Sequence, residues 1–160
     1  MKIGVLADTH DNLPRIREAI ELFNREKVVR VIHAGDFIAP FALDPFRHLN
    51  CEVLGVLGNN DGEREGLAAK FREIGELHPY LATATIAGRR IAAVHYRELA
   101  EPLARSGDFD LVVFGHTHEI EQRQEEGLLL NPGEAGGWLT GLATVALVDL
   151  ETLEVNLREL

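Results

Sequence analysis

The sequence predicts an α/β fold in which two packed β-sheets carry helices on their outer faces. In the first half of the chain, continuous apolar runs alternate with segments of helical periodicity. In the second half, short apolar runs follow one another closely and are separated by turn residues. Alternating strands and helices favour a parallel sheet, closely spaced strands favour antiparallel pairing, and two packed sheets with outer helices accommodate both patterns. The 160 residues suit one domain, and we expect residues 1–160 to form it.

The first half begins with a strand and a helix. Residues 2–7 form a continuous apolar run, which is typical of a strand buried on both faces. Asp-Asn-Leu-Pro at residues 11–14 then predicts the start of a helix, and apolar residues recur at helical spacing up to Phe23. Two more strands are each expected to precede a helical segment, the strands at about 28–33 and 53–57 and the helical segments at 41–49 and 63–74.

The second half is expected to be mostly antiparallel. Its short apolar runs lie at residues 80–87, 91–95, 111–114, 119–123, 128–130, 142–149 and 153–157. Gly88 and Gly127 stand where hairpin turns between such strands are needed. One helix is expected among these strands, at about 98–105.

Composition and charge exclude several classes of protein. The 26 acidic and 16 basic residues give a formal net charge of −10, which repels polyanions, so we expect no binding of nucleic acid or of anionic membrane surfaces. No apolar run approaches the roughly 20 residues of a membrane span, and the carboxylate of Asp8 comes too early for a signal peptide. Cys51 is the only cysteine, which rules out an internal disulfide. We therefore expect a soluble cytoplasmic protein; the sequence leaves its oligomeric state open, a homo-oligomer included.

Five of the apolar runs end in residues that can bind metal ions. The first such residue after each run is, in chain order, Asp8, Asp36, Asn59, His95 and His116. Ligands of α/β proteins bind outside the carboxyl ends of the strands, so these five ends could converge on one site.

The spacing within these motifs lets pairs of ligands act together. Asp8 and His10 are two residues apart, and so are His116 and His118. In extended backbone this spacing places both side chains of a pair on the same side. Glycines next to the ligand residues would let the chain turn sharply there: Gly35, Gly58 and Gly115.

The candidate ligands predict a binuclear centre. They comprise two carboxylates, one amide oxygen and four imidazoles, without a thiolate. Such a mixed nitrogen and oxygen set suits manganese, nickel, iron, zinc or cobalt. Seven ligands are too many for one tetrahedral site, whereas two metal ions that share a bridging carboxylate use all of them. We therefore expect two divalent metal ions per chain.

These motifs resemble those of the calcineurin-like metallophosphoesterases, in particular the small single-domain phosphodiesterase branch. The family pattern runs D-x-H, G-D, G-N-x-D/E, H and G-H-x-H. It occurs here in order as Asp8-Thr9-His10, Gly35-Asp36, Gly58-Asn59-Asn60-Asp61, His95 and Gly115-His116-Thr117-His118. Asn131-Pro132-Gly133 is similar to a loop of the same branch, and the resemblance spans about residues 3–148. It implies a four-layer α/β/β/α sandwich of two mixed β-sheets flanked by helices.

The resemblance also implies a role for each ligand. One metal ion would be held by Asp8, His10, Asp36 and His118. The other would be held by Asp36, Asn59, His95 and His116, with Asp36 as the bridge. Asp36, Asn59 and His95 would then serve catalysis through the bound metals. The implied activity is hydrolysis of small phosphodiesters by a hydroxide that two metal ions activate, with manganese as the first expectation.

Two positions depart from the commonest family pattern. Many members have a histidine, taken to protonate the leaving group, where this chain has Asn60, and an amide cannot act as a general acid. Many members also have H-G-H where this chain reads His95-Tyr96-Arg97. Tyr96 and Arg97 are weak candidates for the missing acid. We therefore expect a preference for leaving groups that depart easily, such as those of aryl phosphodiesters.

Five further residues have more than one interpretation. Asn12 either contacts the substrate phosphate or begins a helix, and Asn60 is the second candidate for substrate contact. Asp61 and His33 are expected to support the ligands by hydrogen bonding or packing rather than to bind metal. Trp138 could line the substrate entrance or an oligomer contact, and core packing is the first expectation.

Two other functions stay open at this point. A non-catalytic scaffold similar to the retromer subunit of this family would explain the absence of the general acid, although a scaffold has little use for all seven ligands. A regulator that binds a phosphate ester and hydrolyses it slowly is the third hypothesis.

Overall fold

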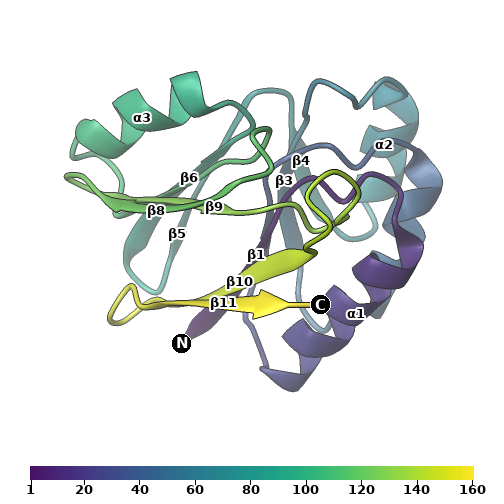
Figure 1. The fold of residues 1–160 in the computed structure, drawn as a ribbon, viewed down its shortest axis with the longest axis horizontal. Helices are drawn as coiled ribbons and strands as arrows, with labels where there is room; N and C mark the ends of the chain where they lie inside the picture. The colour runs from purple at the N-terminus through teal and green to yellow at the C-terminus, as the bar shows by residue number, and fades with distance from the viewer.

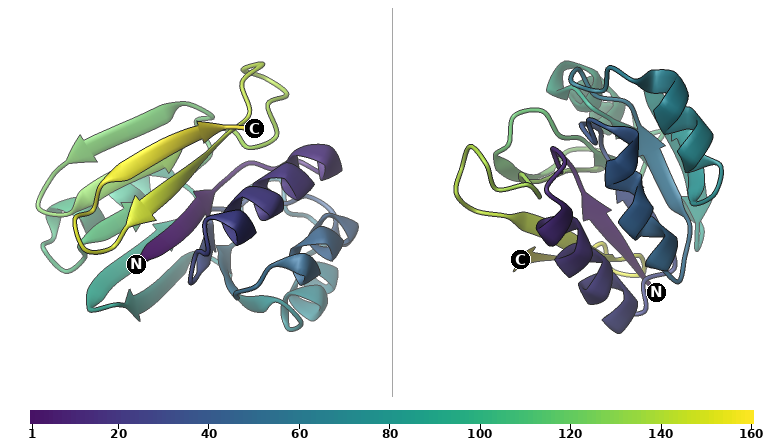
Figure 2. Two further views of the ribbon diagram at one scale, coloured as in Figure 1. Left: turned by 90° about the horizontal axis from the view of Figure 1, so that it is seen from below. Right: turned by 90° about the vertical axis from the view of Figure 1, so that its right-hand side faces the viewer.

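The structure, a computed structural model, describes residues 1–160 and confirms the predicted four-layer arrangement. Two mixed β-sheets pack face to face, with helices α1 and α2 outside one sheet and α3 outside the other, as Figures 1 and 2 show. None of the helices is both long enough and apolar enough to cross a membrane.

The first sheet has six strands in the order β11-β10-β1-β2-β3-β4. Strands β1 to β4 are parallel, and β10 and β11 add antiparallel strands beside β1. The bounds are β1 (Lys2–Leu6), β2 (Val31–His33), β3 (Val53–Val56), β4 (Gly75–His78), β10 (Thr144–Asp149) and β11 (Val155–Glu159).

Three helical segments cover the outer face of this sheet: α1 (Leu13–Arg25), the 3-10 helix η1 (Pro40–His48) and α2 (Arg64–Phe71). Helix α1 begins as the sequence predicts, because the side-chain oxygen of Asn12 accepts a hydrogen bond from the backbone N–H of Arg15 at 3.4 Å. Phe23 on α1 packs directly over Gly4 of β1, where a Cβ atom would lie 2.7 Å from the ring. A glycine on the strand thus lets the helix approach closely.

The second sheet has five strands in the order β5-β6-β7-β9-β8, and α3 (Arg97–Arg105) lies on its outer face. The strand bounds are β5 (Leu81–Ile86), β6 (Arg89–Val94), β7 (Leu111–Val113), β8 (Ile120–Gln124) and β9 (Leu128–Pro132). The outer pairs β5–β6 and β8–β9 are antiparallel, whereas β6–β7 and β7–β9 are parallel. The centre of this sheet is therefore parallel, because α3 carries the chain back between β6 and β7.

The core has one large layer between the two sheets and another between the first sheet and its helices. Ile3 and Val5 of β1 point into the layer between the sheets, whereas Leu6 points to the layer beneath the helices. Strand β1 is thus buried on both faces, which explains its unbroken apolar run.

Strand β4 has no counterpart in the sequence analysis. It has four residues, only one of them apolar, and it lies at the sheet edge with partly exposed side chains. Its backbone pairing with β3, which joins Leu54 to Glu76, sets its conformation, so its own side-chain pattern carries little signal. The preceding helix α2 ends at Phe71, three residues earlier than expected.

Candidate metal centre

All seven candidate ligands lie at one edge of the sandwich. They follow β1, β2 and β3 of the first sheet and β6 and β7 of the second, at the carboxyl end of each strand. This is the end at which parallel strands of α/β proteins present their ligand sites.

The backbone of the ligand loops differs from the extended conformation that the two-residue spacing suggested. Five of the seven candidate ligands have positive φ angles: Asp8 (54°), His10 (42°), Asp36 (60°), His116 (67°) and His118 (61°). Left-handed conformations cost free energy in residues with a side chain, and they persist only where the surroundings impose them. Here the backbone N–H groups of Asp8 and His10 donate to the carbonyl oxygens of Gly35 and Asp36 at 3.0 and 3.1 Å, which ties two ligand loops together.

The three glycines at the site have two different roles. Gly35 has a φ of 96° and turns the chain, as predicted. Gly58 and Gly115 have no positive φ; instead, a side chain at Gly58 would collide with the carboxylate of Asp36, and a Cβ at Gly115 would lie 2.7 Å from Oδ2 of Asp8. These two glycines make room for the carboxylates.

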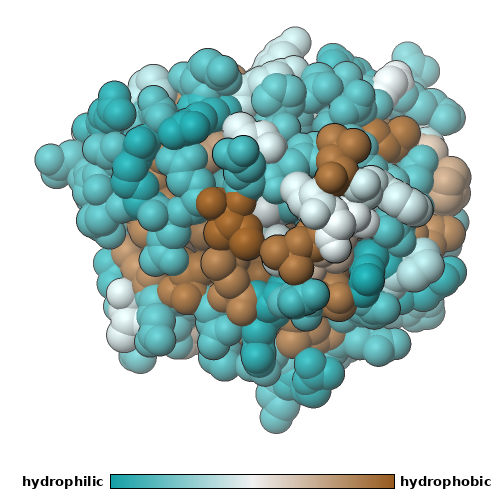
Figure 3. All heavy atoms as spheres, in the orientation of Figure 1, coloured by the Kyte–Doolittle hydropathy of each residue, from teal (hydrophilic) through white to brown (hydrophobic).

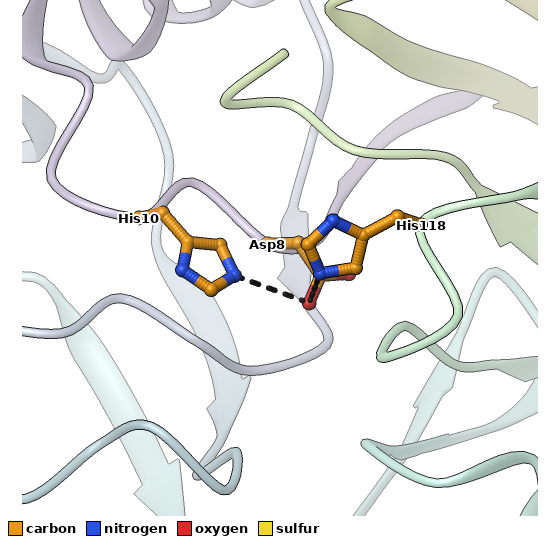
Figure 4. Close-up of side chains that lie close together, drawn as sticks. All are labelled: Asp8, His10 and His118. Carbon is orange, nitrogen blue, oxygen red and sulfur yellow. Dashed lines mark ion pairs between the residues drawn. The ribbon is translucent and has the colours of Figure 1, made fainter. Parts of the chain in front are cut away.

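The first group of candidate ligands surrounds the fully buried carboxylate of Asp8. Its Oδ1 lies 3.5 Å from Nε2 of His118 and 3.8 Å from Nε2 of His10. Figure 4 shows both imidazole rings with a nitrogen turned towards this oxygen. The pKa of His10 is raised, first by its interaction with Asp8 and further by the charge of Asp36.

The second group of candidate ligands surrounds the amide of Asn59. Its Oδ1 lies 2.9 Å from Nε2 of His95 and 2.9 Å from Nδ1 of His116. His95 is buried and comes from the second sheet, whereas Asn59 follows β3 of the first.

Asp36 joins the two groups. Its Oδ2 lies 3.4 Å from Nε2 of His10 and 3.6 Å from Nε2 of His95. The side chain of Asn60 donates to the same oxygen at 2.8 Å, and the backbone N–H of Asn60 donates to Oδ1 at 2.9 Å. Asn60, predicted to contact substrate, thus orients the carboxylate that stands between the two groups.

The donor set fits divalent cations. Nδ1 of His95 lies 2.7 Å from the carbonyl oxygen of Ala34, which can only accept, so Nδ1 carries the proton. The lone pair on Nε2 then faces the oxygens of Asn59 and Asp36, an arrangement that a cation between them would stabilise. Nε2 of His10 is likewise buried and has no hydrogen-bond partner.

Asp61 supports the loop of Asp36. Its carboxylate accepts hydrogen bonds from the backbone N–H groups of Asp36, Gly58 and Ile38 at 3.0, 2.7 and 2.8 Å. Burial raises the pKa of this carboxyl, and the hydrogen bond from Gly58 opposes the rise.

His33 lies behind the same loops and is fully buried. Its ring stacks on Phe37, with centroids 3.7 Å apart. Its Nδ1 accepts from the N–H of Gly35 at 3.2 Å, so Nε2 carries the proton and donates to Oγ1 of Thr9 at 3.1 Å. Burial holds the pKa of His33 well below its usual value.

The remaining candidates are placed as follows. Asn12 caps α1 and donates to the carbonyl oxygen of Gly136 at 2.7 Å. Tyr96 packs against the rings of His95 and His116, whereas Arg97 is paired with glutamates on α3 and β8. The expectation of core packing for Trp138 is wrong, because this residue is 63% exposed.

The sequence analysis missed Glu134, a buried carboxylate beside the first group. Its Oε1 lies 3.4 Å from Nδ1 of His118. Burial alone would raise the pKa of Glu134, but hydrogen bonds from Thr140, Leu139 and Trp138 together hold it below its usual value. Only its place directly after Asn131-Pro132-Gly133 could have drawn attention to it.

Comparison with known proteins assigns the family. The model of the calcineurin-like phosphoesterase superfamily domain matches residues 1–153. The chain belongs to this superfamily. A phosphodiesterase of Methanocaldococcus jannaschii is 41% identical to it over 159 residues, with 96% of each chain covered.

Solved structures agree with this membership. The structure of an archaeal phosphodiesterase matches this calcineurin-like phosphoesterase with a TM-score of 0.94 and 38% identity over 100% of both chains. Vps29 from Chaetomium thermophilum has a TM-score of 0.71 at 18% identity, with 100% of this chain and 94% of that chain covered. The E. coli phosphoesterase YfcE has a TM-score of 0.67 at 18% identity, with 100% and 98% covered. These last two likenesses show the shared fold.

Proposed function

We propose that this calcineurin-like phosphoesterase is a metal-dependent phosphodiesterase that acts on small phosphodiesters with two divalent metal ions per chain. The position of Asp36 carries the proposal, since one of its oxygens lies within 3.6 Å of both His10 and His95. A carboxylate in that place can bridge two cations. The phosphodiesterase relative at 41% identity supports the same activity.

The ligands divide between the two ions along the contacts described above. Asp8, His10 and His118 would hold the first ion, and Asn59, His95 and His116 the second, with Asp36 shared. Manganese is the expected metal, and nickel, iron, zinc and cobalt suit the same donors. When bound, such ions supply Lewis acidity, which acidifies water and offsets the charge of the phosphoryl group.

Residues around Asp36 hold its carboxylate in place. Asp61 and Asn60 fix the two oxygens of Asp36 and its loop through hydrogen bonds of 2.7 to 3.0 Å. Asn60 cannot give a proton to a leaving group. Of the two weaker candidates, Arg97 is paired with glutamates and the ring of Tyr96 packs against His95 and His116. The site therefore favours substrates whose leaving group departs as an anion, such as an aryl phosphodiester.

Charge favours a small substrate over a polyanion. The formal net charge of −10 would become −6 with two divalent ions bound, and the added positive charge would lie at one edge of the sandwich. An anionic ester that fits this edge is attracted, while a long nucleic acid meets the acidic remainder of the surface.

Vps29-like scaffolding has less support. The Vps29 of Chaetomium thermophilum matches at a TM-score of 0.71 and 18% identity, against 0.94 and 38% for the archaeal phosphodiesterase. The chain also keeps every ligand residue of the family pattern, for which a scaffold has little use.

Metal reconstitution tests the proposal. Metal-stripped protein is incubated with Mn²⁺ or Ni²⁺ and bis(p-nitrophenyl) phosphate, and elemental analysis counts the bound ions. We expect two ions per chain and hydrolysis only with metal. Asp36→Asn should lose the bound ions and the hydrolysis. Asp44→Asn, at an exposed carboxylate paired with Lys70, should retain both properties. No turnover with any divalent metal from mildly acidic to alkaline pH would refute the proposal.

A further inference from the structure

We propose that Glu134 is a positioning residue that holds the proton of His118 on Nδ1 and so leaves Nε2 free to bind metal. This inference rests on the proposed function, since it concerns the first metal site. Glu134 touches no substrate atom; it acts through the ring of His118.

The surroundings of Glu134 show that its carboxylate is held in place. Both oxygens accept hydrogen bonds from the loop that follows: Oε1 from the backbone of Trp138 at 2.9 Å, and Oε2 from the backbone and hydroxyl of Thr140 at 3.0 Å each. Leu139 donates to both oxygens at 3.1 Å. The side chain has no solvent exposure and pairs with no lysine or arginine, so His118 is its one partner able to carry a positive charge.

His118 lies between two buried carboxylates. Its Nδ1 is 3.4 Å from Oε1 of Glu134, and its Nε2 is 3.5 Å from Oδ1 of Asp8. Nδ1 is buried and makes no hydrogen bond in this structure, and Oε1 of Glu134 is the carboxylate oxygen beside it. A neutral imidazole has one N–H, so the ring can donate to one carboxylate only.

The choice between the two nitrogens decides whether His118 can bind metal. With the proton on Nε2, the ring would donate to Asp8 and have no lone pair for a metal ion at that position. With the proton on Nδ1, the ring faces Glu134 with its N–H and presents the Nε2 lone pair beside Asp8. A carboxylate on the far nitrogen is the arrangement that sets the tautomer of metal-binding histidines.

Glu134 also stabilises the loop of residues 138–140, but this role does not explain why Nδ1 of His118 lies beside its carboxylate. The loop donors occupy both oxygens whether or not His118 is present, yet the ring of His118 stands with Nδ1 beside Oε1. Thr140 offers a way to separate the two roles. Its hydroxyl contacts Glu134 only at Oε2, not at the Oε1 beside His118, and its other hydrogen bonds are to the backbone of Leu142 in the same loop.

Nitrogen-15 NMR of the histidine rings tests the inference on metal-free protein at alkaline pH. We expect the proton on Nδ1 in the unmodified protein and on Nε2 in Glu134→Gln, since Asp8 is then the only carboxylate beside the ring. The control Thr140→Val should keep the proton on Nδ1. A proton on Nε2 in the unmodified protein would overturn the inference, and this spectrum decides the matter even if Glu134→Gln does not fold. A proton that moves to Nε2 in both Glu134→Gln and Thr140→Val would also overturn the inference, because Glu134 would then act only through the loop.

Calorimetric titration with Zn²⁺ provides the second readout. Glu134→Gln should bind the ion about 10- to 100-fold more weakly than the unmodified protein, which is the usual cost of losing the partner of a metal-binding histidine. Thr140→Val should bind like the unmodified protein, and equal affinity in Glu134→Gln would overturn the inference. Unmodified protein that keeps the proton on Nδ1 but binds no divalent ion would refute the proposed function while upholding the role of Glu134.

Discussion

The carboxylate of Asp36 occupies the space that a side chain at Gly58 would need. The two residues lie on neighbouring loops after β2 and β3, and a Cβ on Gly58 would also come within 2.6 Å of the backbone nitrogen of Asp36. The shape of one loop therefore determines where the proposed bridging ligand of the other can sit.

Gly58→Ala should displace this ligand. We expect a loss of at least about 100-fold in kcat/KM on bis(p-nitrophenyl) phosphate, because misplacement of a catalytic group by about 1 Å has effects of that size. Elemental analysis should show reduced metal content. Gly62→Ala is the matched control, since nothing lies within 4 Å of a Cβ there, and it should behave like the unmodified protein. Full activity in Gly58→Ala would contradict the argument.

Asn60→His should change the dependence on the leaving group. The unmodified enzyme has no proton donor at this position, so we expect it to cleave bis(p-nitrophenyl) phosphate far faster than diphenyl phosphate. A general acid typically contributes about 100- to 10,000-fold, and the histidine should narrow the ratio of the two rates by about 10-fold or more. A ratio unchanged by the substitution, in protein with full metal content, would argue against a general acid at residue 60.

Metal removal should destabilise the fold. Asp8 and Asp36 are buried, and neither is paired with a lysine or arginine, so their charges repel without a cation. Mn²⁺ at 100 times its dissociation constant should contribute about 2.7 kcal/mol, which raises Tm by roughly 5–10 °C in a chain of this size. Calorimetric scans with chelator and with Mn²⁺ measure the shift. Asp44→Asn should retain it and Asp36→Asn should reduce it, and a Tm indifferent to every divalent ion would exclude a metal site.

His33 should make the metal-free protein less stable in mild acid. Its pKa is lowered in the folded state by burial, so below the unfolded value near 6.5 the unfolded chain binds a proton that the folded chain does not. Stability is therefore full above about pH 6.5 and falls as the pH decreases, by up to about 1.4 kcal/mol per unit. Urea unfolding between about pH 5 and 7.5 should show this slope in the unmodified protein and a flatter one in His33→Gln. If the unfolding free energy depends on pH equally in the two proteins, His33 is not the source of the lower stability in acid.

Much of the candidate site could be predicted because the proposed ligands are tied to local patterns. Asp8, Asp36 and Asn59 each follow a buried strand, and the end of a parallel strand is a known place for ligands. The motif of Asp61 predicts a supporting role, and in the structure its carboxylate accepts three hydrogen bonds from backbone N–H groups. Trp138 was misplaced because size and apolarity predict burial, whereas this indole is held at the surface by a hydrogen bond from its Nε1 to the carbonyl oxygen of His10 at 3.0 Å.

The sequence by itself determined the α/β class, the order of most strands and helices, and which residues gather at the site. These follow from hydrophobic periodicity and from residue type, which are local properties. Only the tertiary structure decided that Asp8 and His10 converge through left-handed backbone, that Gly58 and Gly115 make room for carboxylates, and that Glu134 lies beside His118. Each of these depends on contacts between loops far apart in the chain, and no spacing within a single segment records such contacts.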